Sequence, residues 1–331
     1  MSQEVSLERE IAELSKGVDA LKAAVGRRFL GHAGVVEELL VALLARGHVL
    51  LEGAPGLGKT TLAKSLAAGL DLEFGRVQCT PDLMPADVLG TRILEESARD
   101  DRRFVFQRGP IFCHVLLADE INRATPRTQS ALLEAMQEHQ VTVFGETHAL
   151  EEPFFVVATQ NPIEMEGTYP LPEAQLDRFL LKIELRSPGA KELSAILEGT
   201  IGPEQPAVGA ALARERLLRL QVLVREVPVS TDAIAFVTRL VLATHPGDAS
   251  APDEVKRLVR FGVSPRGGQA LLLAAKARAM LRGRLFVAEE DLEALAAPAL
   301  RHRLILGFEA EAAGARPDDV VARATERARR G

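Results

Sequence analysis

Aromatic side chains are scarce in this 331-residue chain, which has no Trp, one Tyr and 13 Phe. Proteins that stack nucleic-acid bases depend on such rings, so the chain offers little base-stacking surface. The two cysteines, Cys79 and Cys113, are too few for a disulfide framework and favour free, buried thiols in a cytoplasmic protein. We expect no membrane span, because no apolar run approaches the ~18 residues that a spanning helix needs.

A strong charge of one sign is also missing, since 40 Lys and Arg face 46 Asp and Glu and give a net charge of −6. Such a balance gives no overall electrostatic footprint for nucleic acid. With 47% hydrophobic and 26% charged residues, the composition is that of a globular protein, and the length predicts about two domains. Membrane, disulfide-rich secreted and disordered classes are thereby excluded, and the function must be sought in motifs.

Secondary-structure patterns change along the chain. Apolar residues spaced by four and three between Leu7 and Val25 predict an amphipathic helix, packed on its own domain or in a coiled coil. Short apolar segments between helices then predict a parallel sheet covered on both faces, up to the break at Ser187-Pro188-Gly189. The predicted strands are 48–52, 74–78, 114–118, 154–158 and 179–185. The predicted helices after the break are 191–198, 211–225, 232–244, 265–281, 289–300 and 318–329.

A glycine-rich loop follows the first of these strands and matches the pattern G-x-x-x-x-G-K-[ST]. The loop consists of Gly53, Ala54, Pro55, Gly56, Leu57, Gly58, Lys59 and Thr60, and the next residue is Thr61. Backbone N–H groups of such a loop surround phosphate oxygens at the positive end of the following helix. Lys59 is expected to contact the phosphates, and Thr60 to bind Mg²⁺.

Two carboxylates, Asp119 and Glu120, end the strand predicted at 114–118. Ligands of open α/β sheets bind at the carboxyl ends of the strands, so both side chains are expected beside the phosphate loop. We expect Asp119 to hold Mg²⁺ and Glu120 to act as the general base that activates water. Outside this context, the same pair would be read as a solvated strand end.

Three further residues are candidates for the same site, each with a simpler alternative. Asn161 ends another apolar strand and could orient water, although Asn-Pro after a strand is typical of a turn. Arg178 lies in a short predicted helix and could equally form an exposed ion pair. Arg266 follows Ser264-Pro265 at a helix start, where a cation opposes the helix dipole by roughly 0.3–1 kcal/mol unless an anion is bound. Outside this context, Arg266 would be read as a surface residue.

Together these motifs are similar to those of the MoxR family of AAA+ ATPases, and the resemblance runs over residues 25–306. The segments that carry it are 47–60 (GHVLLEGAPGLGKT), 119–124 (DEINRA), 129–138 (QSALLEAMQE), 158–162 (ATQNP) and 171–179 (LPEAQLDRF). The apolar spacing places an N-terminal helix at 1–24, before the resemblance begins. The resemblance implies an α/β P-loop AAA+ core with a five-stranded parallel sheet at 25–188. It also implies a smaller, all-helical lid domain at 189–331.

The resemblance also assigns roles to single residues. It implies that Asn161 is the sensor-1 residue, Arg178 an arginine finger toward a neighbouring subunit, and Arg266 the sensor-2 arginine of the lid. His32 occupies the position that contacts adenine. Two insertions are implied in the core, one in helix 2 at about 86–107 and one hairpin at about 140–150.

As a MoxR relative, the chain is expected to hydrolyse ATP to ADP and phosphate with Mg²⁺, as a homo-hexamer that remodels or matures protein clients. A von Willebrand factor A-domain protein is an expected partner. The main alternative is a nucleic-acid-associated AAA+ motor, which the charge and the scarce aromatics disfavour. A small-molecule kinase and a scaffold that binds nucleotide without turnover are the remaining alternatives.

Overall fold

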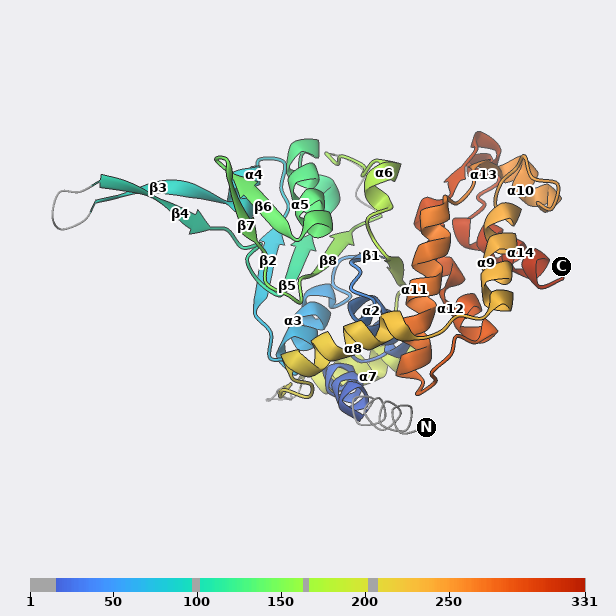
Figure 1. The fold of residues 1–331 in the computed structure, drawn as a ribbon, viewed down its shortest axis with the longest axis horizontal. Coiled ribbons are helices and arrows are strands. Elements are labelled where there is room, and N and C mark those ends of the chain that lie inside the picture. The colour runs from blue at the N-terminus through green and yellow to red at the C-terminus, as the bar shows by residue number, and fades with distance from the viewer. Residues whose placement is uncertain (1–15, 97–101, 163–166, 202–207, 331) are drawn as a thin grey trace.

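The computed structural model describes residues 16–96, 102–162, 167–201 and 208–330 (Figure 1). Residues 16–28 are helical, and the earlier part of the helix predicted from Leu7 lies outside the described residues. A parallel five-stranded sheet occupies the centre of the α/β part, in the order β2-β5-β8-β1-β9. The strands are β1 (Val49–Gly53), β2 (Phe74–Gln78), β5 (Val115–Asp119), β8 (Phe155–Gln160) and β9 (Leu181–Leu185). Each matches a predicted strand within two residues at either end.

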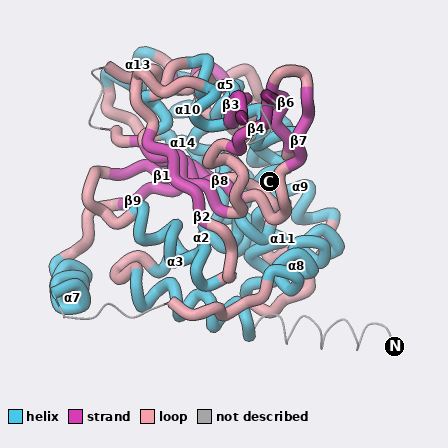
Figure 2. Tube along the Cα trace, turned by 90° about the vertical axis from the view of Figure 1, so that its left-hand side faces the viewer, coloured by secondary structure: helices cyan, strands magenta, loops and turns pink. Residues whose placement is uncertain are grey.

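Helices cover both faces of this sheet, as its continuous apolar strands predict (Figure 2). Alternate residues of the central strands β1, β5 and β8 enter different cores, so Leu51 and Leu117 lie in the core that includes α2 (Ala33–Leu44) and α3 (Lys59–Gly69). Their neighbours Leu50 and Leu116 lie in the second core, which includes the apolar side of α5. The remaining short elements of this part are α4 (Pro85–Leu89), α5 (Pro126–Glu138), α6 (Glu173–Leu176) and the 3₁₀ turn η1 (Ile121–Arg123).

Two β-hairpins extend from the core at the predicted insertions. The longer one, β3 (Gly90–Glu96) with β4 (Arg102–Arg108), projects far from the body of the molecule in Figure 1. The shorter one pairs β6 (Gln140–Val143) with β7 (Glu146–Ala149). An aromatic contact joins them, because the ring of Phe106 stacks on that of His148 with centroids 4.1 Å apart. The two hairpins therefore form one packed unit.

The C-terminal part is helical apart from one short antiparallel pair of strands. Its elements are α7 (Ala190–Ile201), α8 (Arg214–Glu226), α9 (Thr231–Ala243), α10 (Asp253–Leu258), β10 (Val259–Phe261), α11 (Pro265–Leu281), α12 (Glu289–Leu300), the 3₁₀ turn η2 (Arg301–Arg303), β11 (Ile305–Leu306), α13 (Phe308–Ala312) and α14 (Pro317–Arg329). The β10–β11 pair corrects the expectation of helices alone in this part. Strands of two and three residues are too short to show an apolar alternation in sequence.

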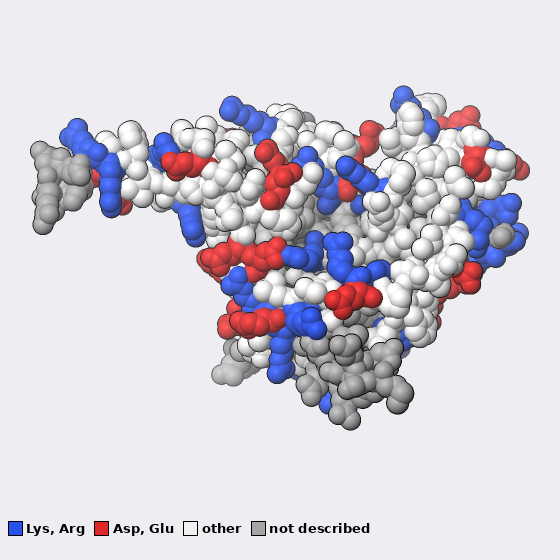
Figure 3. All heavy atoms as spheres, viewed as in Figure 1, with Lys and Arg blue, Asp and Glu red and all other residues white. Residues whose placement is uncertain are grey.

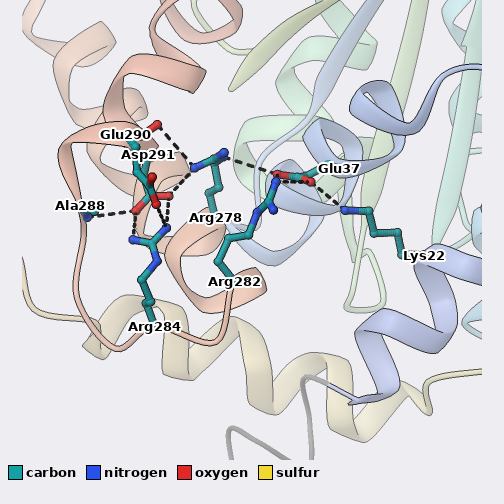
Figure 4. A network of polar contacts seen from close by, with 8 residues as sticks. All are labelled: Lys22, Glu37, Arg278, Arg282, Arg284, Ala288, Glu290 and Asp291. Carbon is teal, nitrogen blue, oxygen red and sulfur yellow. Dashed lines mark hydrogen bonds and ion pairs between the residues drawn. The ribbon is translucent and has the colours of Figure 1, made fainter.

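Ion pairs fasten this helical part to the core (Figure 4). Glu37 of α2 accepts hydrogen bonds from Arg282 Nη2 at 2.8 Å and from Lys22 Nζ at 2.7 Å. Arg278 of α11 contacts Glu37 on one side and the fully buried Asp291 of α12 on the other. Although burial acts to raise the pKa of Asp291, hydrogen bonds from arginines and a backbone N–H outweigh it and hold that pKa below its ordinary value.

Three sequence-based expectations have clear outcomes among the described residues. Cys79 and Cys113 are both free and buried. No described helix combines the length and the apolar character required to cross a bilayer. Ser264 is the N-cap of α11 as predicted, but its side chain makes no capping hydrogen bond.

Candidate functional site

The glycine-rich loop leaves the last residue of β1 and enters α3. Gly56 and Gly58 have φ angles of 81° and 80°, in the left-handed region that favours glycine. A Cβ at Gly58 would also lie 3.2 Å from Phe29 Cε2. Lys59 is buried at the helix start, and its Nζ donates to the Gly53 carbonyl oxygen at 2.7 Å. The backbone is thus shaped as a cradle with the lysine held inside it, as a phosphate loop requires.

A cavity of about 420 Å³ opens beside this loop. Gly56, Leu57, Gly58 and Thr61 line one side of it. The opposite sides come from the segment before α2 and from Pro188 and α7. The lining residues there are Arg27, Arg28, Phe29, Leu30, His32, Pro188, Leu193, Ile196 and Gly199. His32 lies in this lining, and its ring stacks on Phe29 with centroids 5.2 Å apart. Apolar and aromatic walls next to a phosphate cradle suit a nucleoside with its phosphates.

The two carboxylates lie where β5 ends. Asp119 is buried, and its Oδ1 accepts a hydrogen bond from Thr159 Oγ1 at 2.7 Å. Its Oδ2 accepts one from Arg76 Nη2 on the edge strand β2, also at 2.7 Å. Glu120 has a φ of 57°, which is uncommon for a residue with a Cβ and is typical of functional positions.

Hydrogen bonds hold Glu120 in this unusual conformation. Its backbone N–H donates to Thr159 Oγ1 at 2.8 Å, so one threonine joins Asp119 and Glu120. Its Oε2 accepts from Gln78 Nε2 at 3.1 Å and from Arg123 Nη1 at 3.0 Å. The side chain of Glu120 is 20% exposed, so a water molecule can reach it.

Asn161 brings a third strand to the same edge of the sheet. It is buried directly after β8, whose residue Gln160 pairs with Glu52 at the end of β1. Lys59 Nζ lies 3.5 Å from the Gln160 carbonyl oxygen. The structure therefore brings Lys59, Asp119 and Asn161 together at the carboxyl ends of three adjacent strands, where open α/β sheets bind ligands.

Arg178 and Arg266 lie at a different place. Arg178 is half-buried three residues before β9, whose first residue pairs with the first residue of β1. The phosphate loop follows the last residue of β1, roughly 15 Å further along the strands. Arg266 Nη1 lies 3.9 Å from Asp177 Oδ2, and its side chain is 73% exposed. Among the described residues that line the cavity, neither arginine is present.

Arg178 forms no ion pair with any residue in the described ranges, so the structure does not support an exposed ion pair as its role. Arg266, by contrast, is an exposed cation beside a carboxylate, as its simpler alternative allowed. Both arginines therefore lie next to Asp177, before β9, and neither lies beside the phosphate loop of the same chain.

The residues fit a magnesium nucleotide. Among the residues that the structure describes, no cluster of three or more His, Cys, Asp and Glu is suited to hold a metal ion by itself. Asp119 and Thr60 supply only two oxygen ligands. A Mg²⁺ site of one or two protein oxygens completed by phosphate oxygens and water is the usual arrangement for this ion.

The motifs in the sequence did not identify several residues at the site. Phe29 lines the cavity, Arg76 holds Asp119, and Gln78 holds Glu120. Each lies on an element placed there by the tertiary fold. Only the alternation along β2, with Arg76 and Gln78 on one face of an edge strand, hinted that they act together.

Known proteins are similar in sequence to this chain over most of its length. The chain is 41% identical to Chaperone MoxR1 of Mycobacterium tuberculosis over 317 residues, which are 96% of this chain and 82% of the relative. The chain belongs to the MoxR family of AAA+ ATPases. Protein MoxR of Paracoccus denitrificans is 35% identical, over 86% of this chain and 87% of the relative.

Other comparisons agree with the MoxR assignment. Residues 48–181 match the ATPase family associated with various cellular activities (AAA), and residues 252–324 match the AAA lid domain. The crystal structure of a protein from Cytophaga hutchinsonii assigned as an ATPase has a TM-score of 0.91 and 35% identity, covering 99% of this chain and 98% of that one. The predicted P-loop AAA+ core followed by a lid is confirmed. The proposed boundary at residue 188 stays a prediction.

Proposed function

We propose that this MoxR-family protein hydrolyses ATP to ADP and phosphate at the edge of the sheet formed by β1, β5 and β8. The observation that carries the proposal is the contact of Thr159 with both Asp119 and Glu120, one strand away from the phosphate loop and Lys59. A buried acid and a reachable base fixed beside a phosphate cradle are the parts that phosphoryl transfer to water requires.

Each residue has a defined task in this proposal. The N–H groups of residues 53–60 and the Lys59 ammonium bind the β- and γ-phosphates, and His32 with Phe29 contacts the adenine. Glu120 accepts the proton of the attacking water, which Asn161 orients. Mg²⁺, held by Thr60 and Asp119, would neutralise charge on the phosphate oxygens.

We further propose that Arg178 and Arg266 serve the nucleotide of a neighbouring subunit. Their separation from the phosphate loop of their own chain supports this, since Arg178 precedes β9 at the amino ends of the strands, whereas the phosphate loop follows the carboxyl end of the neighbouring β1. A head-to-tail contact that repeats in this way closes into a ring, which we propose to be a hexamer. Arg266 thus takes a different place from the sensor-2 role within one subunit that the sequence predicted.

The cellular role proposed here is the maturation or remodelling of protein clients in the cytoplasm. The name of the Mycobacterium tuberculosis relative, Chaperone MoxR1, supports a protein client, and a von Willebrand factor A-domain protein remains the proposed partner. The two free, buried thiols agree with a reducing compartment. Positive and negative side chains are interspersed on the face seen in Figure 3, so this face does not favour a nucleic-acid motor.

Replacing the proposed base tests the reaction directly. We expect Glu120→Gln to bind ATP about as well as the wild type but to release phosphate at least about 100-fold more slowly, because the amide cannot accept the water proton. Phosphate release and the binding of a fluorescent ATP analogue are the two measurements. The matched control is Glu134→Gln, an exposed carboxylate on α5 that should leave both unchanged. Equal turnover by Glu120→Gln and wild type would remove Glu120 as the base.

A further inference from the structure

An arginine of the lid reaches the backbone on both sides of Arg178. Arg303, in η2, donates from Nε to Asp177 Oδ1 at 2.6 Å. Its guanidinium also donates to the carbonyl oxygens of Asp177 at 3.2 Å, Phe179 at 2.8 Å and Leu180 at 3.2 Å. A further hydrogen bond, to the Ala299 carbonyl oxygen, connects it to the preceding helix α12. The residue before Arg178 and the two after it are therefore tied to the lid by one side chain.

The contact of Arg303 with residues 177–180 is buried. Burying a charged side chain costs desolvation free energy that simple attachment of the lid would not require. The side chain of Arg303 is 4% exposed, and burial lowers its pKa although Asp177 acts in the opposite direction. A well-packed apolar side chain would often join two elements as stably as a buried ion pair does. What an apolar side chain lacks is the planar fork of donors that fixes several carbonyl oxygens in one geometry.

The neighbouring residues of the lid act on the same segment. The buried His302 ring contacts the Phe179 carbonyl oxygen through Nε2 at 3.0 Å. Arg266, from α11, approaches the second oxygen of Asp177 at 3.9 Å. Since α11 and α12 pack together and η2 follows α12, these contacts come from one packed group of lid elements. The position of residues 177–180 is thus set by contacts with the lid as well as by the sheet.

We propose that Arg303 is a positioning residue for Arg178: it sets the backbone of residues 177–180 so that the Arg178 side chain is presented to the nucleotide of the next subunit. This inference rests on the proposed action of Arg178 across a subunit interface. It adds that the lid of one subunit controls the rate of ATP hydrolysis at the site of the neighbouring subunit. Among the described residues that line the nucleotide cavity of the same chain, Arg303 is absent.

Two substitutions of Arg303 test the inference. Arg303→Met removes all donors at similar volume, and Arg303→Lys keeps a charge near Asp177 without the fork and serves if the first variant loses its fold. We expect ATP turnover to fall about 100-fold, since a misplacement of about 1 Å can cost that much. Affinity for a fluorescent ATP analogue should stay within about twofold of the wild type, because the binding cavity is separate. The matched control is Arg239→Met, a lid arginine that donates to the Ala328 carbonyl oxygen within the lid.

Mixed assemblies separate positioning from structural support. An Arg303→Met subunit keeps an intact nucleotide site, whereas a Glu120→Gln subunit keeps an intact Arg178 segment. Mixing them in equal amounts should raise activity from about 1% to about a quarter of wild type, because half the sites keep Glu120 and half of their neighbours keep Arg303. No recovery on mixing would mean that Arg303 supports its own site and would overturn the inference.

A second mixture distinguishes this failure from failure of the proposed function. Arg178→Ala mixed with Glu120→Gln should recover activity whenever Arg178 acts across the interface, whatever Arg303 does. Recovery in this mixture but not with Arg303→Met overturns the positioning role alone. Recovery in neither mixture overturns the action of Arg178 on a neighbour.

Discussion

At the scale of single residues, the site depends on backbone conformations that few side chains tolerate. Gly56 and Gly58 adopt left-handed φ angles in the phosphate loop, and Glu120 adopts one despite its Cβ. Such a conformation costs of order 1–3 kcal/mol for a residue other than glycine and persists only when its surroundings hold it. For Glu120 the holding groups are Thr159, Gln78 and Arg123.

Gly58→Ala should weaken both nucleotide binding and stability. The added Cβ would lie 3.2 Å from Phe29 in a backbone conformation disfavoured for alanine, at a cost of about 1–2 kcal/mol. A titration with a fluorescent ATP analogue should show roughly tenfold weaker binding, and thermal unfolding a lower midpoint. Gly34→Ala in α2 is the control, since no atom lies within 4 Å of its added Cβ. Unaltered binding by Gly58→Ala would contradict the role given to this loop.

Local motifs predicted the phosphate loop and the two carboxylates because each needs only a few consecutive residues and a strand before them. The partners that hold these groups were not predictable. Arg303 and Asp177 are 126 residues apart, and no spacing rule links a 3₁₀ turn of the lid to the residue before Arg178. Arg266 was assigned to the phosphates from its helix start, whereas the fold places it beside Asp177.

At the scale of elements, α2 carries two adjacent carboxylates whose pKa values are shifted in opposite directions. Burial raises the pKa of Glu38 to about 7, and Arg301 of η2 only partly offsets it. The carboxylates that face Glu38 and raise its pKa further are Glu37 of α2, Asp318 of α14 and Glu184 of β9. Burial also acts to raise the pKa of Glu37, but hydrogen bonds from Lys22 and Arg282 outweigh it, and that pKa is lowered.

These shifts predict opposite effects of removing each charge. Between about pH 4.5 and 7 the folded chain keeps a proton on Glu38 that the unfolded chain releases, so this residue makes the protein less stable as the pH rises. Glu38→Gln should therefore raise the free energy of unfolding at pH 8 by up to about 3 kcal/mol and leave it unchanged near pH 4.5. Glu37→Gln, the matched control, should lower it at pH 8. Urea unfolding at both pH values measures this, and parallel profiles for wild type and Glu38→Gln would count against the raised pKa.

Elements with a strong apolar pattern were predictable, and short ones were not. The central strands β1, β5 and β8 were predicted because they are buried on both faces and read as continuous apolar segments, whereas the edge strands β2 and β9 are only partly buried. The β10–β11 pair was missed because three and two residues carry no periodicity. The contact between the two hairpins through Phe106 and His148 depends on tertiary packing. The resemblance therefore implied each insertion but not the contact between them.

At the scale of the whole molecule, one chain carries two separate groups of candidate site residues. The cavity, the phosphate loop and Glu120 lie at the carboxyl ends of the strands. Arg178 and Arg266 lie with Arg303 before β9, at the amino ends of the strands. The parallel direction of β1 and β9 decides this separation. Sequence motifs alone give neighbours along the chain, so they could not tell whether Arg266 faces its own nucleotide or that of another subunit.

The measurement that tests this account most directly is ATP turnover per subunit as a function of protein concentration, with light scattering at each concentration to report assembly. We predict that turnover per subunit rises steeply as the subunits associate, because an arginine supplied by a neighbour can contribute about 10³–10⁵ in rate. The same titration of Arg178→Ala should stay flat and low. Full turnover at concentrations where the wild-type chain is monomeric would contradict a site shared between subunits.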